Sequence, residues 1–232
     1  MGIRRMIDKW GRERFEFVQD PIDFFDLMGQ AAWHRELQMT CLHTASIREM
    51  DDVVDMACGA GWLGLYLAHR VNTVYFVDKD ERMVERARRN AIKYKIDNVA
   101  FQVADASHLP YPDYRFSVIF CVNLLFLLDD PLKAIREMMR TLKPGGRLIM
   151  VNPSRNMNLW AAEQYCMNNG ITQLDKDMFV SWAATAARCN PLMIRSLENP
   201  QIPEAELIKQ HYMLGGLASF VRVVKRKELP TA

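Results

Sequence analysis

From residue 52 onward, short apolar runs alternate with longer segments in which apolar residues recur every three or four positions. The short runs predict strands, and the longer segments predict amphipathic helices. The predicted strands are 52–57, 73–77, 99–103, 116–122 and 147–151, and the predicted helices between them are 62–70, 81–94 and 131–142. Strands that alternate with helices of this length form a parallel sheet with helices on both faces.

Helical patterns also flank this alternating region. The basic amphipathic stretch 3–12 predicts a helix that packs on its own domain rather than on a membrane surface, and a further helix is expected at 29–46. Residues 155–200 are mostly helical in pattern. Two final strands, about 204–214 and 218–227, predict an antiparallel hairpin around a pair of glycines.

Together these elements predict an α/β fold with a mostly parallel seven-stranded sheet and a C-terminal antiparallel hairpin. At 232 residues the chain is long enough for one sizeable buried core, whereas two full domains would be cramped. We expect an N-terminal helical cap at 1–50, a core at 51–154, a helical insert at 155–200 and closing strands at 201–232.

Composition narrows the class of protein. The chain has 30 basic and 28 acidic residues, a formal charge of +2, which is less basic than most nucleic-acid binders. The five cysteines are scattered without a C-x-x-C pair, so neither a disulfide framework nor a metal site is predicted. No apolar run approaches the roughly 18 residues of a membrane span. We therefore expect a cytoplasmic monomer or homodimer with no membrane or nucleic-acid partner.

One loop carries the candidate chemistry. Residues 53–64 read V-V-D-M-A-C-G-A-G-W-L-G and place three glycines between a predicted strand and a predicted helix. Such a turn brings backbone N–H groups and the positive end of the helix dipole close to a ligand. Asp78 ends the next strand, where a carboxylate binds ribose hydroxyls. Because a dinucleotide and other adenosine-containing ligands both fit these features, the glycine spacing alone leaves the choice open.

Three further features favour an adenosine-containing ligand without a diphosphate. Asp55 lies inside the end of the first strand, where a carboxylate attracts an ammonium group or hydroxyls and repels a pyrophosphate. Asp105 follows the third strand and is placed to accept a hydrogen bond from an exocyclic amine such as adenine N6. The sequence L-K-P-G-G-R at 142–147 predicts a tight turn from a helix into the next strand. Three carboxylates around one pocket suit a cationic ligand with a ribose.

The order of these segments resembles a known family. V-V-D-M-A-C-G-A-G, V-D-K-D-E-R-M, D-A-S-H-L-P and L-K-P-G-G-R-L, spread over residues 50–152, resemble the motifs of class I S-adenosylmethionine-dependent methyltransferases. Ala57 stands where the family usually has its first glycine, a small change that still permits close approach. The resemblance implies a Rossmann-like three-layer sandwich with N-terminal helices and a helical lid insert. It also implies S-adenosyl-L-methionine as cofactor and S-adenosyl-L-homocysteine as product.

The resemblance assigns roles to matching positions. It implies that Asp78 binds the ribose hydroxyls, that Asp105 and Ala106 meet the amino edge of adenine, and that Cys121 and Asn123 border the sulfonium. The full set of expected cofactor-binding residues is Asp55, Ala57, Cys58, Gly59, Gly61, Asp78, Lys79, Met83, Asp105, Ala106, Cys121 and Asn123.

The substrate is less constrained. No D-P-P-Y or N-P-P-Y motif follows the fourth strand, so the chain resembles neither the amino-directed DNA methyltransferases nor the glutamine-directed ones. Aromatic and methionine residues within 155–200 suit a flat, largely apolar molecule. The candidate substrate contacts are Phe25, Trp33, Phe126 and Trp160, and the candidate catalytic base is His34.

We therefore expect methyl transfer by in-line displacement to a nitrogen, oxygen or carbon atom of a small aromatic or heterocyclic metabolite. Three alternatives stay open. The basic residues of 81–94 allow an RNA or protein methyltransferase. The glycine motif allows an NAD-linked oxidoreductase, and any member of the family could bind the cofactor without turnover.

Overall fold

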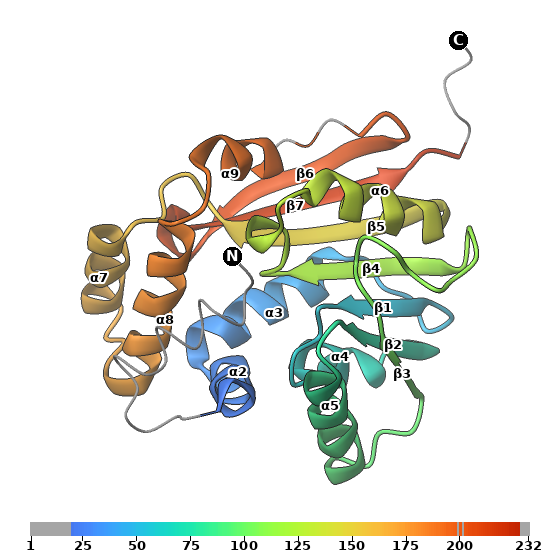
Figure 1. The fold of residues 1–232 in the computed structure, drawn as a ribbon, viewed down its shortest axis with the longest axis horizontal. Helices are drawn as coiled ribbons and strands as arrows, with labels where there is room; N and C mark the ends of the chain where they lie inside the picture. Colours follow the sequence, from blue (N-terminus) through green and yellow to red (C-terminus); the bar gives the residue numbers. More distant parts are fainter. Residues whose placement is uncertain (1–19, 199, 201, 228–232) are drawn as a thin grey trace.

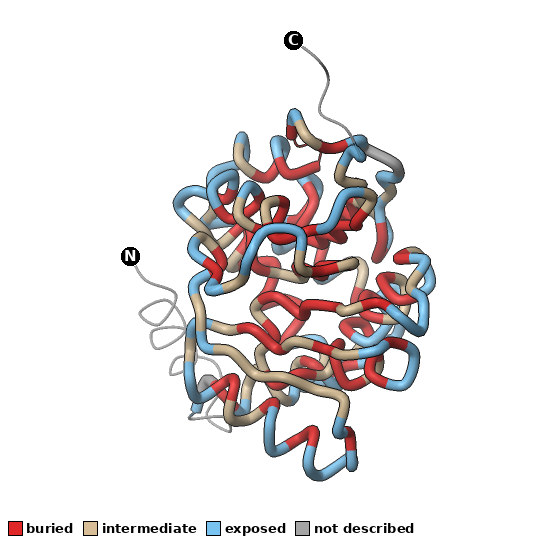
Figure 2. The backbone as a smooth tube through the Cα atoms, turned by 90° about the vertical axis from the view of Figure 1, so that its right-hand side faces the viewer, coloured by how far each residue is buried: buried red, intermediate tan, exposed pale blue. Residues whose placement is uncertain are grey.

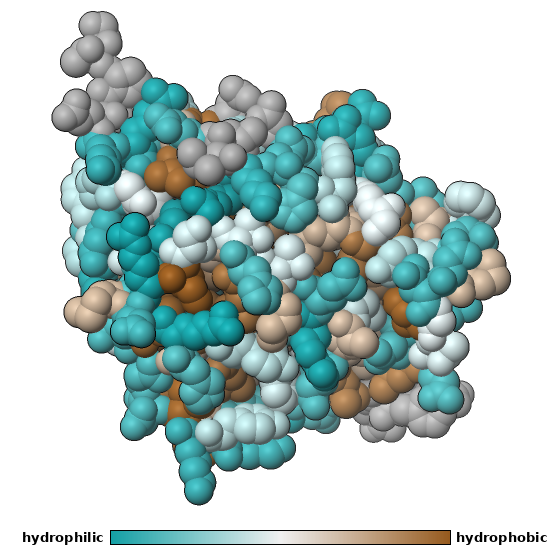
Figure 3. Space-filling view, turned by 180° about the vertical axis from the view of Figure 1, so that it is seen from behind, coloured by the Kyte–Doolittle hydropathy of each residue, from teal (hydrophilic) through white to brown (hydrophobic). Residues whose placement is uncertain are grey.

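The computed structural model of the chain describes residues 20–198, 200 and 202–227. The basic helix expected at 3–12 lies outside these residues. Among the described helices, none has the length and apolar character needed to cross a membrane. Seen from behind, polar residues cover most of the molecule, and apolar ones show in smaller areas between them (Figure 3).

A single sheet of seven strands runs through the described chain in the order β3-β2-β1-β4-β5-β7-β6 (Figure 1). The five strands from β3 to β5 are parallel, and β7 lies antiparallel between β5 and β6. The strands are β1 (Asp52–Met56), β2 (Thr73–Asp78), β3 (Val99–Val103), β4 (Phe116–Val122), β5 (Leu142–Pro153), β6 (Ala205–Met213) and β7 (Ala218–Lys225). This confirms the predicted mostly parallel sheet with an antiparallel C-terminal hairpin.

Helices cover both faces of the sheet and extend beyond one of its ends. The α-helices are α2 (Pro21–Gln30), α3 (Ala32–Thr44), α4 (Trp62–Ala68), α5 (Glu81–Lys93), α6 (Pro131–Thr141), α7 (Leu159–Asn168), α8 (Gln173–Ala186) and α9 (Pro191–Glu198). Two short 3₁₀ helices are η1 (Leu125–Leu127) and η2 (Leu214–Gly216). Right-handed crossovers place α4 and α5 on one face and α6 on the other, because the chain steps outward in opposite directions from β1 and from β4.

Side-chain caps explain where several helices begin. Asp20 caps α2 by accepting from the N–H of Ile22, and Asp130 caps α6 by accepting from the N–H of Lys133; each helix then starts with a proline. Asp80 caps α5 in the same way. Between the helices, buried residues follow the strands through the middle of the molecule (Figure 2).

Two local predictions were wrong. The helix expected at 29–46 is two helices, because Ala31 adopts an extended ψ of 141° between α2 and α3. The segment 142–147, expected as a tight turn, belongs to β5; its pairing with β4 shifts register between Phe116 and Val118, and Gly145 takes a φ of +77° there. Glycine adopts that conformation without steric cost.

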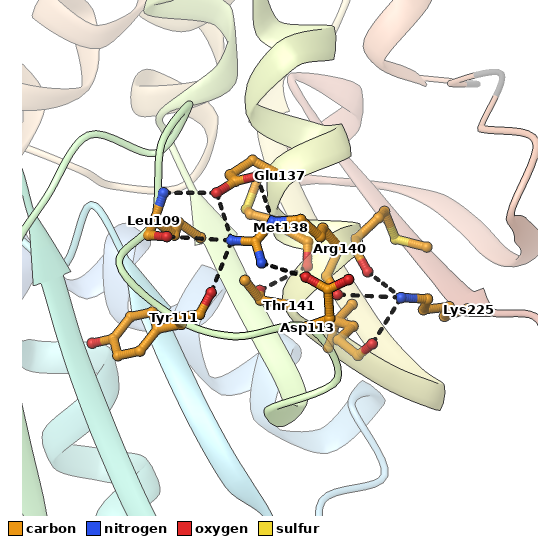
Figure 4. A network of polar contacts seen from close by, with 10 residues as sticks. Leu109, Tyr111, Asp113, Glu137, Met138, Arg140, Thr141 and Lys225 are labelled. Atoms are coloured by element: carbon orange, nitrogen blue, oxygen red, sulfur yellow. Dashed lines mark hydrogen bonds and ion pairs between the residues drawn. The ribbon is translucent and has the colours of Figure 1, made fainter.

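A polar network lies at the end of the sheet where the parallel strands begin (Figure 4). The Arg140 guanidinium of α6 donates to the carbonyls of Leu109 and Tyr111 and pairs with Glu137 and Asp113. The Lys225 ammonium, at the end of β7, donates to the carbonyls of Met139 and Leu142. These contacts join α6, the loop before β4 and the last strand at the edge opposite the strands' carboxyl ends.

Candidate active site

A cavity of about 470 Å³ opens where β1, β2, β3 and β4 end. The carboxyl ends of parallel strands are the usual ligand-binding edge of such sheets. Its walls come from the ends of these four strands, the loops after them, the first turn of α5, η1 and α2. They are formed by Phe25, Met56, Ala57, Gly59, Val77, Asp78, Lys79, Asp80, Glu81, Arg82, Met83, Ala104, Asp105, Ala106, Asn123, Leu124, Leu127 and Leu128.

The three glycines of the loop after β1 have different surroundings. A Cβ on Gly59 would meet no atom within 4 Å, so its backbone stands open toward the cavity. Gly61 has a φ of +86° and lies directly before α4, where a Cβ would come within 2.9 Å of Ala87. A Cβ on Gly64 would lie 2.2 Å from the ring of Phe76. Only the first glycine therefore faces the ligand space, and the others allow α4 to approach the sheet.

Asp78, at the end of β2, is fixed by backbone donors. Its carboxylate accepts from the N–H of Gly59 and from the N–H of Asp80, each at 3.0 Å. Burial raises the pKa of Asp78, and these two hydrogen bonds oppose that shift by favouring the charged form. The carboxylate thus joins the glycine loop to the start of α5 while it lines the cavity.

Asp55 lies beneath the loop rather than in the cavity wall. The residue is only 4% exposed, and Oδ2 accepts from the N–H of Gly64 at 2.9 Å. Burial raises the pKa of Asp55 to about 8, and the nearby Asp78 charge adds to the shift. Asp55 therefore ties β1 to the first turn of α4. Of the three carboxylates expected around the pocket, Asp78 and Asp105 line it and Asp55 does not, so the prediction was wrong for Asp55.

Asp105 and Asn123 occupy the other side of the cavity. Asp105 is exposed, and its side chain accepts from the N–H of Ser107 at 2.7 Å, which bends the chain after β3. Asn123 follows β4 with a φ of +60°. Neither polar atom of the Asn123 side chain has a partner within the described structure, although both are buried. Since an unpaired buried polar group costs about 1–3 kcal/mol, this amide points to a ligand that satisfies it.

Eight of the expected cofactor residues come together in the cavity wall: Ala57, Gly59, Asp78, Lys79, Met83, Asp105, Ala106 and Asn123. Asp55, Cys58, Gly61 and Cys121 do not line it. Cys58 is 9% exposed and Cys121 is fully buried, and burial raises the pKa of both thiols.

The expected substrate contacts are dispersed. Phe25 of α2 lines the cavity. Phe126 is 2% exposed within η1 and does not line the cavity, whereas the nearby Leu124 and Leu127 do. Trp33 is equally buried and stacks on Trp182 of α8, with ring centroids 5.4 Å apart. Trp160 is 71% exposed on α7.

His34, the expected base, lies on α3 at 8% exposure. Burial lowers the pKa of His34 to about 4, so the imidazole is neutral near pH 7. Its Nδ1 has no hydrogen-bond partner within the described structure. The same holds for Gln38 Oε1 on the next turn of α3, and for Ser181 Oγ and Trp182 Nε1 on α8. Buried polar atoms without partners thus gather on two helices that contact each other through Trp33 and Trp182.

The sequence did not identify several lining residues. They are Met56, Val77, Asp80, Glu81, Arg82, Ala104, Leu124, Leu127 and Leu128. Each of them lies within two residues of one that was identified, so their closeness to the strand ends was the signal that the sequence offered. Across the described residues, no group of three or more histidine, cysteine, aspartate or glutamate side chains is arranged to hold a metal ion.

A family model described as a methyltransferase domain matches residues 54–150, which include the glycine loop and every strand end around the cavity. Residues 54–150 therefore form a methyltransferase domain of the class I S-adenosylmethionine-dependent type. Its cofactor is S-adenosylmethionine.

Known proteins resemble this methyltransferase to different extents. An uncharacterized methyltransferase, YcgJ of Bacillus subtilis, is 36% identical over 48% of this chain, a match that spans only 44% of that protein. A demethylmenaquinone methyltransferase from Symbiobacterium thermophilum is 28% identical over 95% of this chain and 94% of its own length. Among solved structures, a methyltransferase from Aquifex aeolicus superimposes with a TM-score of 0.62 at 19% identity, covering 89% of this chain and 98% of that one. The structural likeness shows the shared Rossmann-like fold.

Proposed function

We propose that the protein transfers the methyl group of S-adenosylmethionine to a nitrogen, oxygen or carbon atom of a small aromatic or heterocyclic metabolite. The observation that carries this proposal is the cavity at the strand ends, which combines a fixed carboxylate, an open glycine and an unpaired amide. The named small-molecule substrate of the relative that matches over nearly the whole chain supports the substrate class.

In this proposal the cofactor extends from the glycine loop to the loop after β3. The carboxylate of Asp78 accepts from the ribose hydroxyls, because backbone donors hold it at the cavity wall. Lys79 and Met83 lie against the adenine face. Asp105 and Ala106 meet its amino edge, where Asp105 accepts from the amino group. Asn123 satisfies its unpaired amide on the methionine part of the cofactor.

The cofactor supplies a methyl group activated by a sulfonium, and the chain supplies alignment and exclusion of water. Phe25, Leu124, Leu127 and Leu128 give the cavity an apolar wall on the side of α2 and η1. Apolar walls lower the local dielectric and keep water away from the methyl group. Residues 155–200, which hold α7 to α9, form part of the substrate pocket in this proposal.

The acceptor is proposed to bind beside α3 and α8. The support is the group of unpaired polar atoms on His34, Gln38, Ser181 and Trp182, which donors and acceptors of a ring-substituted metabolite would satisfy. His34 is neutral near pH 7, so its unpaired Nδ1 is able to accept a hydrogen bond from the attacking group, while the burial that lowers its pKa to about 4 also weakens it as a base.

The proposal is tested first by calorimetric titration with S-adenosylmethionine, S-adenosylhomocysteine and NADH, and then by methyl transfer to a panel of hydroquinones, phenols and heterocyclic amines. Binding of both sulfur compounds and methylation of one panel member are expected. Tight NADH binding without binding of the sulfur compounds would overturn the proposal, and cofactor binding without turnover on any small molecule would indicate a sensor.

His34→Ala tests the proposed base. We expect turnover to fall at least about tenfold while the Kd for S-adenosylmethionine is unchanged, since the side chain lies outside the cofactor cavity. His43→Ala is the matched control, because His43 is exposed on the same helix. Near-normal turnover of His34→Ala would remove this residue from the mechanism.

A further inference from the structure

One carboxylate, Asp26, holds helix α2 against the rest of the molecule. Its Oδ1 accepts from Trp62 Nε1 at 2.8 Å and from Asn90 Nδ2 at 3.2 Å, and its Oδ2 accepts from the Arg86 guanidinium at 2.9 Å. The Asp26 side chain is only 15% exposed. Donors from α4 and α5 thus converge on a single residue of α2.

Two of these donors also adjoin the glycine loop. Asn90 is 7% exposed, and its Nδ2 donates to the carbonyl of Ala60 at 2.9 Å as well as to Asp26. Trp62 is the first residue of α4 and directly follows Gly61. The carboxylate of Asp26 is therefore connected to the loop from both sides, through a backbone carbonyl and through the start of the next helix.

The close approach of α2 adds to this connection. Gly29, nearly one turn after Asp26, lies so near Trp62 that a Cβ would be 2.3 Å from the indole Cδ1. On the same helix, Phe25 lines the cofactor cavity. Docking of α2 on Trp62 therefore also fixes the position of the Phe25 ring in the cavity wall.

We propose that Asp26 is a positioning residue for cofactor binding: it docks α2 so that Phe25 closes the cavity and the glycine loop keeps its binding conformation. Release of α2 opens that wall and removes one of the two acceptors that orient the Asn90 amide, which donates to the carbonyl of Ala60. The inference rests on the proposed function, since it requires that S-adenosylmethionine occupy this cavity. It adds that the docking of α2 determines how long the protein retains its cofactor.

The expected effect follows from the fraction of molecules with α2 docked. When only a docked state binds well, the apparent affinity falls in proportion to that fraction. Asp26→Asn removes the charge that faces Arg86 and places an NH₂ group among three donors, so one donor must face another in either amide orientation.

The test compares Asp26→Asn with Asp23→Asn. Asp23 is one turn earlier on α2 and pairs with the same Arg86, yet its side chain is 54% exposed, which makes it a matched control. For Asp26→Asn we expect the Kd for S-adenosylhomocysteine to rise at least about fivefold, mainly through faster dissociation. Asp23→Asn should stay within about twofold of the wild type, as for an exposed ion pair.

Hydrogen exchange of the α2 amides distinguishes a local release of α2 from a general loss of stability. S-adenosylhomocysteine should protect these amides in the wild type and much less in Asp26→Asn, while β4 and β5 exchange alike in both. If Asp26→Asn does not fold, Trp62→Phe replaces it, because phenylalanine keeps an aromatic ring on α4 while it loses the indole N–H and part of the indole volume.

The outcomes separate this inference from the proposed function. A wild-type protein that does not bind S-adenosylhomocysteine would overturn the proposed function. A wild-type protein that binds it, together with Asp26→Asn or Trp62→Phe that bind and release it at wild-type rates, would overturn the role of Asp26 alone.

Discussion

Gly64→Ala tests whether the third glycine of the loop serves packing. A Cβ at this position would lie 2.2 Å from Cε1 and 2.6 Å from Cζ of Phe76, against a normal carbon–carbon contact of about 3.5–4 Å. Phe76 is fully buried and stacks on Phe101 at a centroid distance of 5.2 Å, so its ring has little room to move. Displacement of α4 would instead break the hydrogen bond from Gly64 to Asp55.

Overpacking of this kind costs about 1–3 kcal/mol, and the better helix propensity of alanine returns up to about 1 kcal/mol. We therefore expect a net loss of about 1–2 kcal/mol and a melting temperature lower by about 2–8 °C for a chain of this size. Thermal unfolding followed by far-ultraviolet circular dichroism measures the shift. In the double variant with Phe76→Leu, which removes the two contacted ring atoms, the losses should be less than additive.

A Gly64→Ala protein that melts at or above the wild-type temperature would refute this reasoning, because the Phe76 ring would then have to yield without cost. Strict additivity with Phe76→Leu would refute it as well, because the two positions would then not be in conflict.

Two further predictions concern charge. The folded-state pKa of Asp55, about 8, lies above the roughly 4 of an unfolded aspartate, so the folded protein keeps a proton that the unfolded chain releases; its stability should fall as pH rises between about 4 and 8. Asp55→Asn should flatten the decline of the melting temperature with pH, and an unchanged slope would mean that protonation of Asp55 does not cause the decline. Bulk tRNA should not bind with a steep salt dependence, because Arg86 pairs with Asp23 and Asp26, and Arg88 and Arg89 with Glu85. A steep negative slope of binding against salt in fluorescence anisotropy would revive an RNA substrate.

The sequence predicted the strands well because most of them are covered on both faces and therefore read as continuous apolar runs. Helices α5 and α6, which begin after a capping aspartate, were placed to within a few residues. Helix α2 begins in the same way, after Asp20, but was not predicted at its observed position. Local pattern failed at Ala31, where α2 and α3 meet. No proline marks that break, and Gly29, two residues before it, is still part of α2. The first N–H of α3 is satisfied by a residue far along the chain, Asp175.

The site residues could be predicted from the sequence where they lie directly at the ends of strands. Asp78 and Asn123 were found because each directly ends or follows an apolar run. Asp55 was wrongly expected in the cavity wall. Its carboxylate instead accepts a hydrogen bond from the N–H of Gly64 in α4, and the sequence does not reveal such a contact between a strand end and a neighbouring helix. The role of Asp26 left no signal, since its partners Trp62, Arg86 and Asn90 come from other helices.

The position of β7 has a consequence for how the protein is made. The strand is inserted between β5 and β6, and it pairs with β5 from Arg147 to Pro153. Until residues 218–225 leave the ribosome, the nascent chain therefore carries β5 as an open, apolar edge strand that invites pairing with other chains. Premature stop codons before Ala218 should for this reason yield aggregates rather than a smaller active enzyme.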